Sequence, residues 1–151
     1  MELYELNYIQ LRRLIPDIDL VPERAVSRVP QGLDLYLDVR ERSRYTTTLH
    51  LSYCFAEAGG SVLAPDLVIR MYHDAQVAEV VSRGKGRDRG GRGLERFRHD
   101  YPVAARWRVN RFLHKWLGFC LRHGHEFSPA RLRLGEVLDA QEAAPAASLE
   151  S

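Results

Sequence analysis

The chain has 151 residues and a mass of 17.3 kDa, of which 45% of residues are hydrophobic and 28% are charged. These values are typical of one soluble globular domain and argue against a disordered or fibrous protein. No run approaches the roughly 20 apolar residues of a membrane span. Two cysteines, Cys54 and Cys120, are too few for a disulfide scaffold. We therefore expect a cytoplasmic protein with no membrane partner.

The formal net charge of +2 is unevenly distributed along the chain. Residues 83–115 hold eleven Lys and Arg against three acids, a net charge of +8, and the remaining eleven cations and seventeen acids give −6. Such an asymmetry attracts anions even when the whole protein is nearly neutral. After Leu134 every charged residue is acidic. We predict a single α+β domain over residues 1–134 and a disordered acidic tail over 135–151.

The first predicted element is an amphipathic helix over residues 2–15. Four residues recur there at helical spacing: Tyr4, Tyr8, Leu11 and Ile15. Pro16 cannot continue a helix, and a turn-rich connection follows it.

Two alternating runs, residues 33–39 and 45–55, then predict a hairpin with one apolar face. We pair Val39 with Tyr45, which also sets Asp34 opposite His50 and sorts apolar from polar side chains. The chain breaks at the glycines and proline of positions 59, 60 and 65.

Two further extended runs, residues 66–74 and 76–82, predict a second hairpin. A two-residue turn at Asp74 and Ala75 places Arg70 opposite Glu79. In this register the apolar and charged side chains again separate to opposite faces.

Residues 83–93 contain five glycines and no apolar side chain, which predicts a flexible Arg/Gly loop. Pro102 suits a first helical turn, and an apolar stripe follows up to Gly124. The stripe consists of Val109, Phe112, Leu113, Trp116, Leu117 and Cys120. Because one-sided strands need a cover, the predicted fold is α+β: a four-stranded antiparallel sheet with the N-terminal and C-terminal helices packed on one face.

Several segments together resemble one known family. They are Asn7-Tyr8, Leu11–Pro16, Glu41 with Ser43–Thr47, Arg70 with Tyr72–Ala75 and Val77–Val80, Asp100–Pro102, and Asn110 through His123-Gly124. Their order and spacing are similar to those of the small bacterial YqiB-like proteins, grouped as domain of unknown function 1249. The resemblance implies a cytoplasmic protein with no established activity, cofactor or substrate. The Arg/Gly loop and the tail after Gly124 depart from the family pattern.

The second hairpin holds the best candidates for chemistry, because an imidazole and carboxylates near a turn can share a proton or hold a metal. The end of the first hairpin adds groups that bind anions. The candidate ligand-binding residues are Arg42, Arg44, Tyr45, Arg70, Tyr72, His73, Asp74 and Glu79. Strand alternation, however, points His73 away from Tyr72 and Asp74. The plainer interpretation is a turn aspartate beside an Arg70–Glu79 ion pair.

A second motif, Cys120-x-x-His123-x-His125, contains three groups that bind transition metals. A structural zinc site takes four ligands, and the other cysteine lies on a predicted strand, so we expect neither a metal nor a cofactor. A buried cysteine and a histidine at a helix C-terminus explain the same residues.

The candidate anion-binding residues lie in and after the Arg/Gly loop. They are Arg83, Lys85, Arg87, Arg89, Arg92, Arg96, Arg98, Arg106 and Arg108. Cations spaced by glycine can follow a nucleic-acid backbone, and Phe97, Tyr101 and Trp107 are interleaved with them, as a single-strand binder requires. The plainer interpretation is a solvated loop beside a basic helix face.

The leading hypothesis is a non-enzymatic binding or adaptor module with a basic face for an anionic partner, either a nucleic acid or an acidic protein surface. The alternative is a small-molecule enzyme or ligand sensor that uses a site around Tyr72-His73-Asp74, and it requires those side chains to line one cleft. A third hypothesis is self-association into a homo-oligomer. No catalytic constellation is recognised in the sequence.

Overall fold

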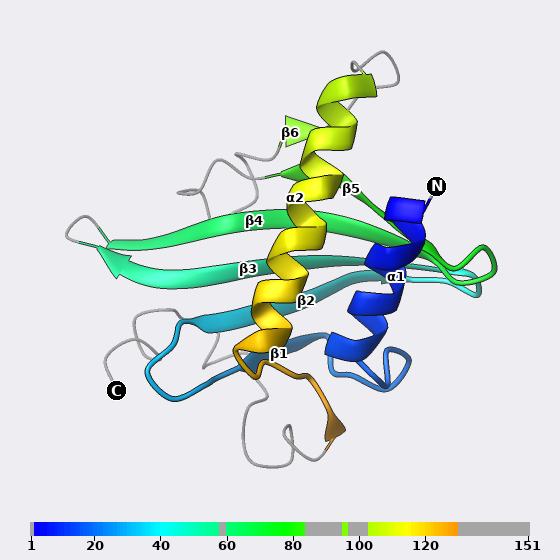
Figure 1. Cartoon of the computed structure of the whole chain (residues 1–151). Helices are drawn as coiled ribbons and strands as arrows, with labels where there is room; N and C mark the ends of the chain where they lie inside the picture. The colour runs from blue at the N-terminus through cyan, green and yellow to red at the C-terminus, as the bar shows by residue number, and fades with distance from the viewer. Residues whose placement is uncertain (1, 58–59, 84–94, 97–102, 130–151) are drawn as a thin grey trace.

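The computed structural model describes residues 2–57, 60–83, 95–96 and 103–129, with side chains for all of these except 55–57, 60–64 and 95–96. Six strands form one antiparallel sheet in chain order, and two helices lie across it (Figure 1). The elements are α1 (Glu2–Leu14), β1 (Arg24–Ser27), β2 (Asp34–Arg42), β3 (Thr46–Glu57), β4 (Gly60–Tyr72), β5 (Val77–Arg83), β6 (Glu95–Arg96) and α2 (Val103–Arg122). Except for Arg83, the predicted Arg/Gly loop lies outside the described residues, as does the predicted tail.

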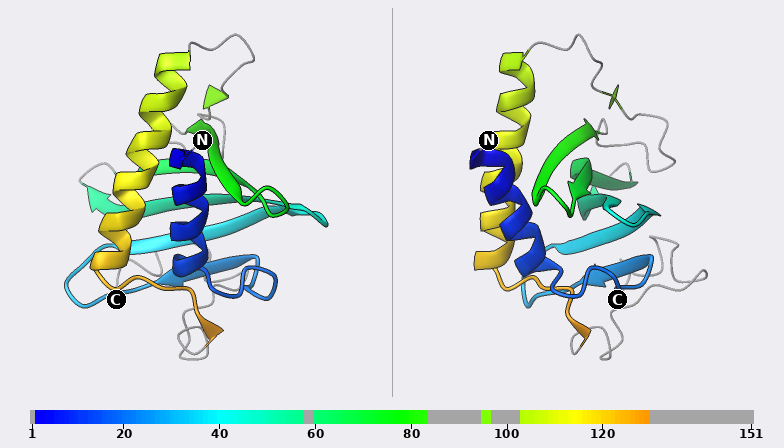
Figure 2. Two further views of the ribbon diagram at one scale, coloured as in Figure 1. Left: turned by 45° about the vertical axis from the view of Figure 1, so that its right-hand side comes forward. Right: turned by 90° about the vertical axis from the view of Figure 1, so that its right-hand side faces the viewer.

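Both helices cover the same face of the sheet (Figure 2), which confirms the predicted α+β class and helix placement. This face holds the core, because strands β2 to β5 send alternate apolar residues toward the helices. The largest fully buried side chains include Leu11, Leu35, Leu49, Ile69, Met71, Leu113 and Leu117. Since each such side chain stabilises the fold by roughly 1.5–3 kcal/mol, the helix-covered face supplies most of the stabilising burial.

The sheet has more strands than the predicted four. Strand β1 has four residues and pairs with β2, and β6 has only two residues and pairs with the end of β5. Both strands are too short to show a periodic pattern in the sequence. Ala25 and Val26 of β1 are nevertheless completely buried.

The first hairpin has a different register from the predicted one. Val39 pairs with Leu49 and not with Tyr45, a shift of four residues, because the chain turns later and the pairing is irregular between Val39 and Glu41. Side-chain orientation repeats every two residues, so an even shift leaves each apolar side chain on its predicted face. The shift moves His50 from Asp34 to Asp38 as its cross-strand neighbour.

In the second hairpin the predicted pairing of Arg70 with Glu79 is confirmed, but the two-residue turn is wrong. The chain turns through four residues, 73–76, and the backbone N–H of Gln76 donates to the carbonyl of Tyr72 at 2.7 Å. A tight turn would need positive φ at both Asp74 and Ala75, whereas the longer loop needs it only at Gln76, where φ is 57°.

Strand β4 begins at Gly60, so the predicted chain break does not extend to Pro65. The register of β3 against β4 shifts between Ser52 and Cys54, and Pro65 lies in this irregular stretch without a ladder partner. Proline is tolerated at such a position because it has no N–H to donate.

Two asparagines join the helices to strand β5. The Val80 N–H donates to Asn110 Oδ1 at 2.8 Å, and Asn110 Nδ2 donates to the Arg106 carbonyl at 2.9 Å. From α1, Asn7 Nδ2 donates to the Asn110 carbonyl at 3.1 Å. Both asparagines are buried, so these bonds satisfy the Asn110 amide and Asn7 Nδ2, whereas Asn7 Oδ1 is buried without a partner.

Helix α2 ends near the predicted position, since Gly124 follows it with a φ of 89°, a conformation that favours glycine. Over the described residues, neither helix is long and apolar enough to cross a membrane.

Candidate functional site

His73 lies on the helix-covered face, between α1 and β3. Its Nδ1 is 2.9 Å from the Tyr8 hydroxyl, and its Nε2 is 2.8 Å from Thr47 Oγ1. Burial lowers the pKa of His73, which favours the neutral imidazole. A neutral ring donates at one nitrogen and accepts at the other, and the Tyr8 and Thr47 hydroxyls can each take either role. This histidine holds α1 on the sheet.

Tyr72 and Glu79 lie on the opposite face of the sheet, which we call the far face. The Tyr72 hydroxyl donates to Glu79 Oε2 at 2.8 Å, and burial, together with this bond, raises the pKa of Tyr72. Arg70 Nε donates to Thr48 Oγ1 at 3.2 Å. The cross-strand neighbours Arg70 and Glu79 thus use other partners and do not form the ion pair expected from their register.

The remaining candidate ligand-binding residues lie at the ends of the hairpins. Asp74 accepts a bond from the Ala75 N–H at 2.9 Å, which stabilises the turn. Arg42 donates to main-chain carbonyls of the segment between α1 and β1. The Arg44 guanidinium lies 5.1 Å from the centre of the Tyr45 ring. The structure therefore distributes the eight candidates over two faces and two turns and does not bring them into one cluster.

The Cys-x-x-His-x-His motif is also divided among separate neighbours. Cys120 Sγ donates to the Tyr53 hydroxyl at 3.5 Å, and burial raises the pKa of Cys120 to about 11. His123 donates to the Phe119 carbonyl, whereas His125 is buried beside Ser27 at 2.9 Å. In the described part of the chain, no three His, Cys, Asp or Glu residues converge as metal ligands.

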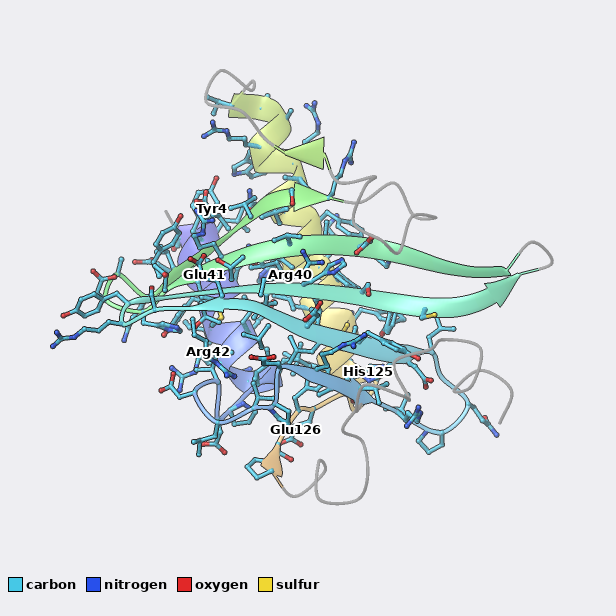
Figure 3. All side chains as sticks on the ribbon, turned by 180° about the vertical axis from the view of Figure 1, so that it is seen from behind. Tyr4, Arg40, Glu41, Arg42, His125 and Glu126 are labelled. Atoms are coloured by element: carbon cyan, nitrogen blue, oxygen red, sulfur yellow. The ribbon has the colours of Figure 1, made fainter. Side chains whose placement is uncertain are left out.

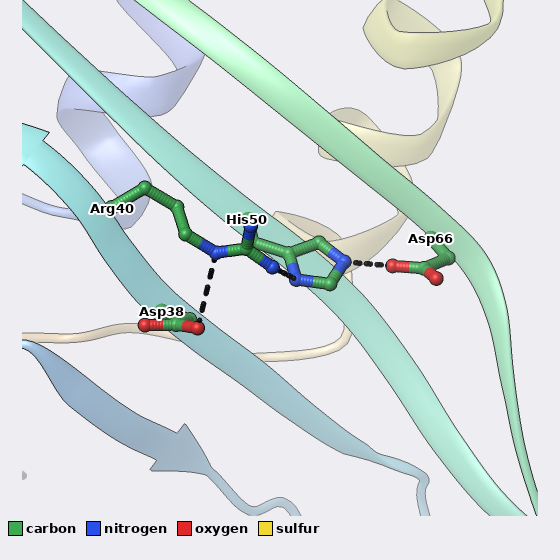
Figure 4. A network of polar contacts seen from close by, with 4 residues as sticks. All are labelled: Asp38, Arg40, His50 and Asp66. Carbon is green, nitrogen blue, oxygen red and sulfur yellow. Dashed lines mark hydrogen bonds and ion pairs between the residues drawn. The ribbon is translucent and has the colours of Figure 1, made fainter. Parts of the chain in front are cut away.

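The far face carries a polar network that sequence reasoning missed (Figures 3 and 4). Arg40 Nε donates to Asp38 at 3.2 Å, and its terminal amino group donates to His50 Nδ1 at 2.8 Å. His50 Nε2 in turn donates to Asp66, whose side chain is only 3% exposed. Arginine has no acceptor, so His50 must accept at Nδ1 and carry its proton on Nε2. The network joins β2, β3 and β4, and each of its four side chains is hydrogen-bonded to another.

The candidate anion-binding residues are described only in part. Lys85, Arg87, Arg89, Arg92 and Arg98 lie outside the described residues, and only the backbone of Arg96 is described. Arg83 is exposed at the end of β5, and Arg106 and Arg108 belong to α2. The basic surface that the structure describes therefore lies on α2.

The outward side of α2 combines exposed cations with exposed aromatic rings. None of the 20 residues of α2 is acidic. At 100° per residue, seven of its exposed side chains fall within an arc of about 140°. We call this surface the basic-aromatic face; it comprises Trp107, Arg108, Arg111, Phe112, Lys115, Phe119 and Arg122. Phe112 belongs to the predicted apolar stripe, but its side chain is 44% exposed.

The aromatic rings of this face are supported from beneath. Phe112 stacks on Trp116 with ring centres 6.3 Å apart, and Phe119 packs edge-on against Tyr53 and stacks on His123. The Arg111 guanidinium lies 5.1 Å from the centre of the Trp107 ring. Phe112 and Phe119 are therefore held against neighbouring rings, and all three aromatic side chains of this face remain exposed to solvent.

These features define a small α+β protein with two distinct polar surfaces, a hydrogen-bonded network on the far face of the sheet and a basic-aromatic face on a covering helix. The chain belongs to the family described as "Protein of unknown function (DUF1249)", whose profile matches residues 10–126, including all of α2. This confirms the resemblance seen in the sequence.

Relatives with the same printed name, "Uncharacterized protein YqiB", occur in Escherichia coli strain K12 and in Escherichia coli O157:H7. Each is 36% identical to this chain over an alignment of 132 residues, which covers 82% of this chain and 87% of the relative. No solved structure gives a significant match.

Proposed function

We propose that this protein is a non-enzymatic binding module of the cytoplasm and that the basic-aromatic face of α2 binds an anionic partner. The observation that carries the proposal is the charge of this face: four exposed cations and no acidic residue along 20 residues of helix. The cations are Arg108, Arg111, Lys115 and Arg122. Cys54 and Cys120 are buried and do not form a disulfide with each other, which fits a reducing compartment.

The charge of this face is available to a partner. Among the described residues, no carboxylate forms an ion pair with any of the four cations. Like charges on one surface create a local field that raises the concentration of anions near it. Each exposed contact contributes little, but several together give an affinity that falls steeply with salt.

Binding is favoured over catalysis by what the reactive groups do. His73 is neutral and bonded at both ring nitrogens, and the Cys120 thiol has a raised pKa, so it remains protonated near neutral pH. The alternative hypothesis of a small-molecule site has less support, since His73 and Tyr72 lie on opposite faces of the sheet. Self-association stays a prediction that the mass of the protein in solution will test.

The proposal is tested by titrating the full chain into fluorescently labelled polyanions over a series of salt concentrations. We expect affinity to fall with salt, and the double variant Arg111→Glu, Lys115→Glu to lose most of it. The matched control, Arg13→Glu with Arg44→Glu, makes the same change in net charge at exposed positions away from α2. An equal loss in the control, or no salt-dependent binding by the unaltered protein, would refute the proposal.

A further inference from the structure

We propose that the anionic partner on the basic-aromatic face is a single-stranded nucleic acid, with phosphates along the row of cations and bases stacked on the aromatic rings. This inference rests on the proposed function and deepens it, because it names the chemical class of the partner.

The cations form a row that suits an extended polyanion. On an α-helix Arg111, Lys115 and Arg122 lie within about 40° of one another around the axis. They follow the axis at intervals of about 6 Å and about 10 Å. A flexible strand can align its phosphates with such a row, and each contact to phosphate releases counterions. The row therefore supplies affinity without selecting a sequence.

The aromatic rings flank this row on both sides. Trp107 lies at one margin of the face, and Phe112 and Phe119 lie toward the other, with exposed fractions of 47%, 44% and 42%. Nucleic-acid bases stack on such rings with little regard to sequence, because every base has a π face. An acidic peptide satisfies the cations but offers few planar groups to these rings.

The preference for a single strand follows from access to the bases. In a duplex the base faces are covered by their neighbours, so they cannot reach Trp107 or Phe112 without unstacking. The rings are also held in place, Phe112 by Trp116 and Phe119 by Tyr53 and His123. Rings that are already ordered lose little conformational freedom on binding, which favours stacking.

Arg111 adds a contact that combines both kinds of interaction. Its guanidinium lies over the Trp107 ring, 5.1 Å from the ring centre, so the two side chains form one stacked unit. The guanidinium can bind a phosphate through charge-assisted hydrogen bonds, and its own plane can also stack on a base. Trp107 and Arg111 therefore form a single nucleotide contact.

The test compares a labelled oligothymidine strand with a duplex of the same length, a polyglutamate chain and vesicles of anionic phospholipid. We expect the strand to bind most tightly and to quench tryptophan fluorescence. Trp107 is the source of that signal, since it is 47% exposed and the other tryptophan, Trp116, is 5% exposed.

The contribution of stacking to affinity is measured with variants that replace an aromatic ring by the apolar side chain of leucine. Trp107→Leu and Phe112→Leu should each weaken strand binding roughly 5-fold or more, with circular dichroism melting curves close to that of the unaltered protein. Tyr45→Leu is the matched control, because Tyr45 is 50% exposed and lies in the turn between β2 and β3. This variant should leave the affinity for the strand unchanged.

The outcomes separate the inference from the proposed function. Salt-dependent binding that is equal for strand, duplex and polyglutamate, and insensitive to Trp107→Leu and Phe112→Leu, overturns the single-strand inference and leaves the anionic-partner proposal standing. Tighter binding of polyglutamate or vesicles than of the strand has the same consequence. An absence of binding to all four probes overturns both.

Discussion

The far face of the sheet and the basic-aromatic face of α2 are both rich in charge, but they use it differently. On the far face, Asp38, Arg40, His50 and Asp66 form a chain in which each group has a partner within the protein. On α2, cations of one sign face solvent without carboxylate partners among the described residues. Charged groups that are hydrogen-bonded within the protein maintain its fold, whereas charges of one sign that face solvent attract a partner of opposite charge.

If this contrast is correct, changes in the far-face network should reduce stability, and changes on α2 should reduce binding. We expect the largest loss in the free energy of unfolding for changes on the far face and the smallest for changes on α2.

The largest loss should follow His50→Leu, which removes the donor to the buried Asp66 carboxylate. We expect a loss of about 2–3 kcal/mol in the free energy of unfolding, because a buried charged acceptor would lack its partner. Urea denaturation measures this. The double variant His50→Leu with Asp66→Leu should recover part of the loss, since both polar groups are then absent. If the double variant were as unstable as the sum of the single variants, the network would not be the cause.

A somewhat smaller loss should follow Asn110→Ala. This change removes the acceptor of the Val80 N–H and empties a buried position, and we expect a loss of about 1–3 kcal/mol in denaturant. Asn110→Asp is the informative comparison, since it retains an oxygen for Val80 but loses the bond to the Arg106 carbonyl. Equal stability of the alanine variant and the unaltered protein would contradict the role assigned to Asn110.

The sequence predicts the helix-covered face better than the polar groups. Alternation identifies Leu35, Leu37 and Val39 as residues of the core face. This prediction survives the register error of four residues, because an even shift keeps each side chain on the same face. The His50–Asp66 contact depends on the register of β3 against β4, and the Asn110–Val80 bond depends on tertiary packing. Periodicity contains neither piece of information.

The basic-aromatic face, in contrast, was within reach of sequence reasoning. The helical periodicity that buries Leu113, Trp116 and Leu117 also places Arg111 and Lys115 on the outer arc. The predicted anion-binding residues instead run from Arg83 to Arg108, and of these only Arg108 belongs to the basic-aromatic face.

A pH-dependent effect should come from His73. Its pKa is lowered in the folded protein, mainly by burial, so the folded state favours the neutral imidazole relative to the unfolded chain. The contribution is fully present above the ordinary pKa of about 6.5 and is lost as pH falls below it and through the folded-state value. Thermal melting at a series of pH values should show this loss. In His73→Gln that component of the pH dependence should be absent; an unchanged pH profile would contradict the assignment.

The smallest change in stability should accompany the largest change in binding. Arg111→Glu with Lys115→Glu alters exposed side chains that touch no part of the core, so the free energy of unfolding should stay within about 0.5 kcal/mol for each substitution. The same variant should lose most of its salt-dependent affinity for polyanions. His50→Leu should do the reverse, with lower stability and unchanged affinity at a temperature where it remains folded. If the α2 variant instead unfolded as readily as His50→Leu, the cations of α2 would be structural, and the distinction between the two faces would fail.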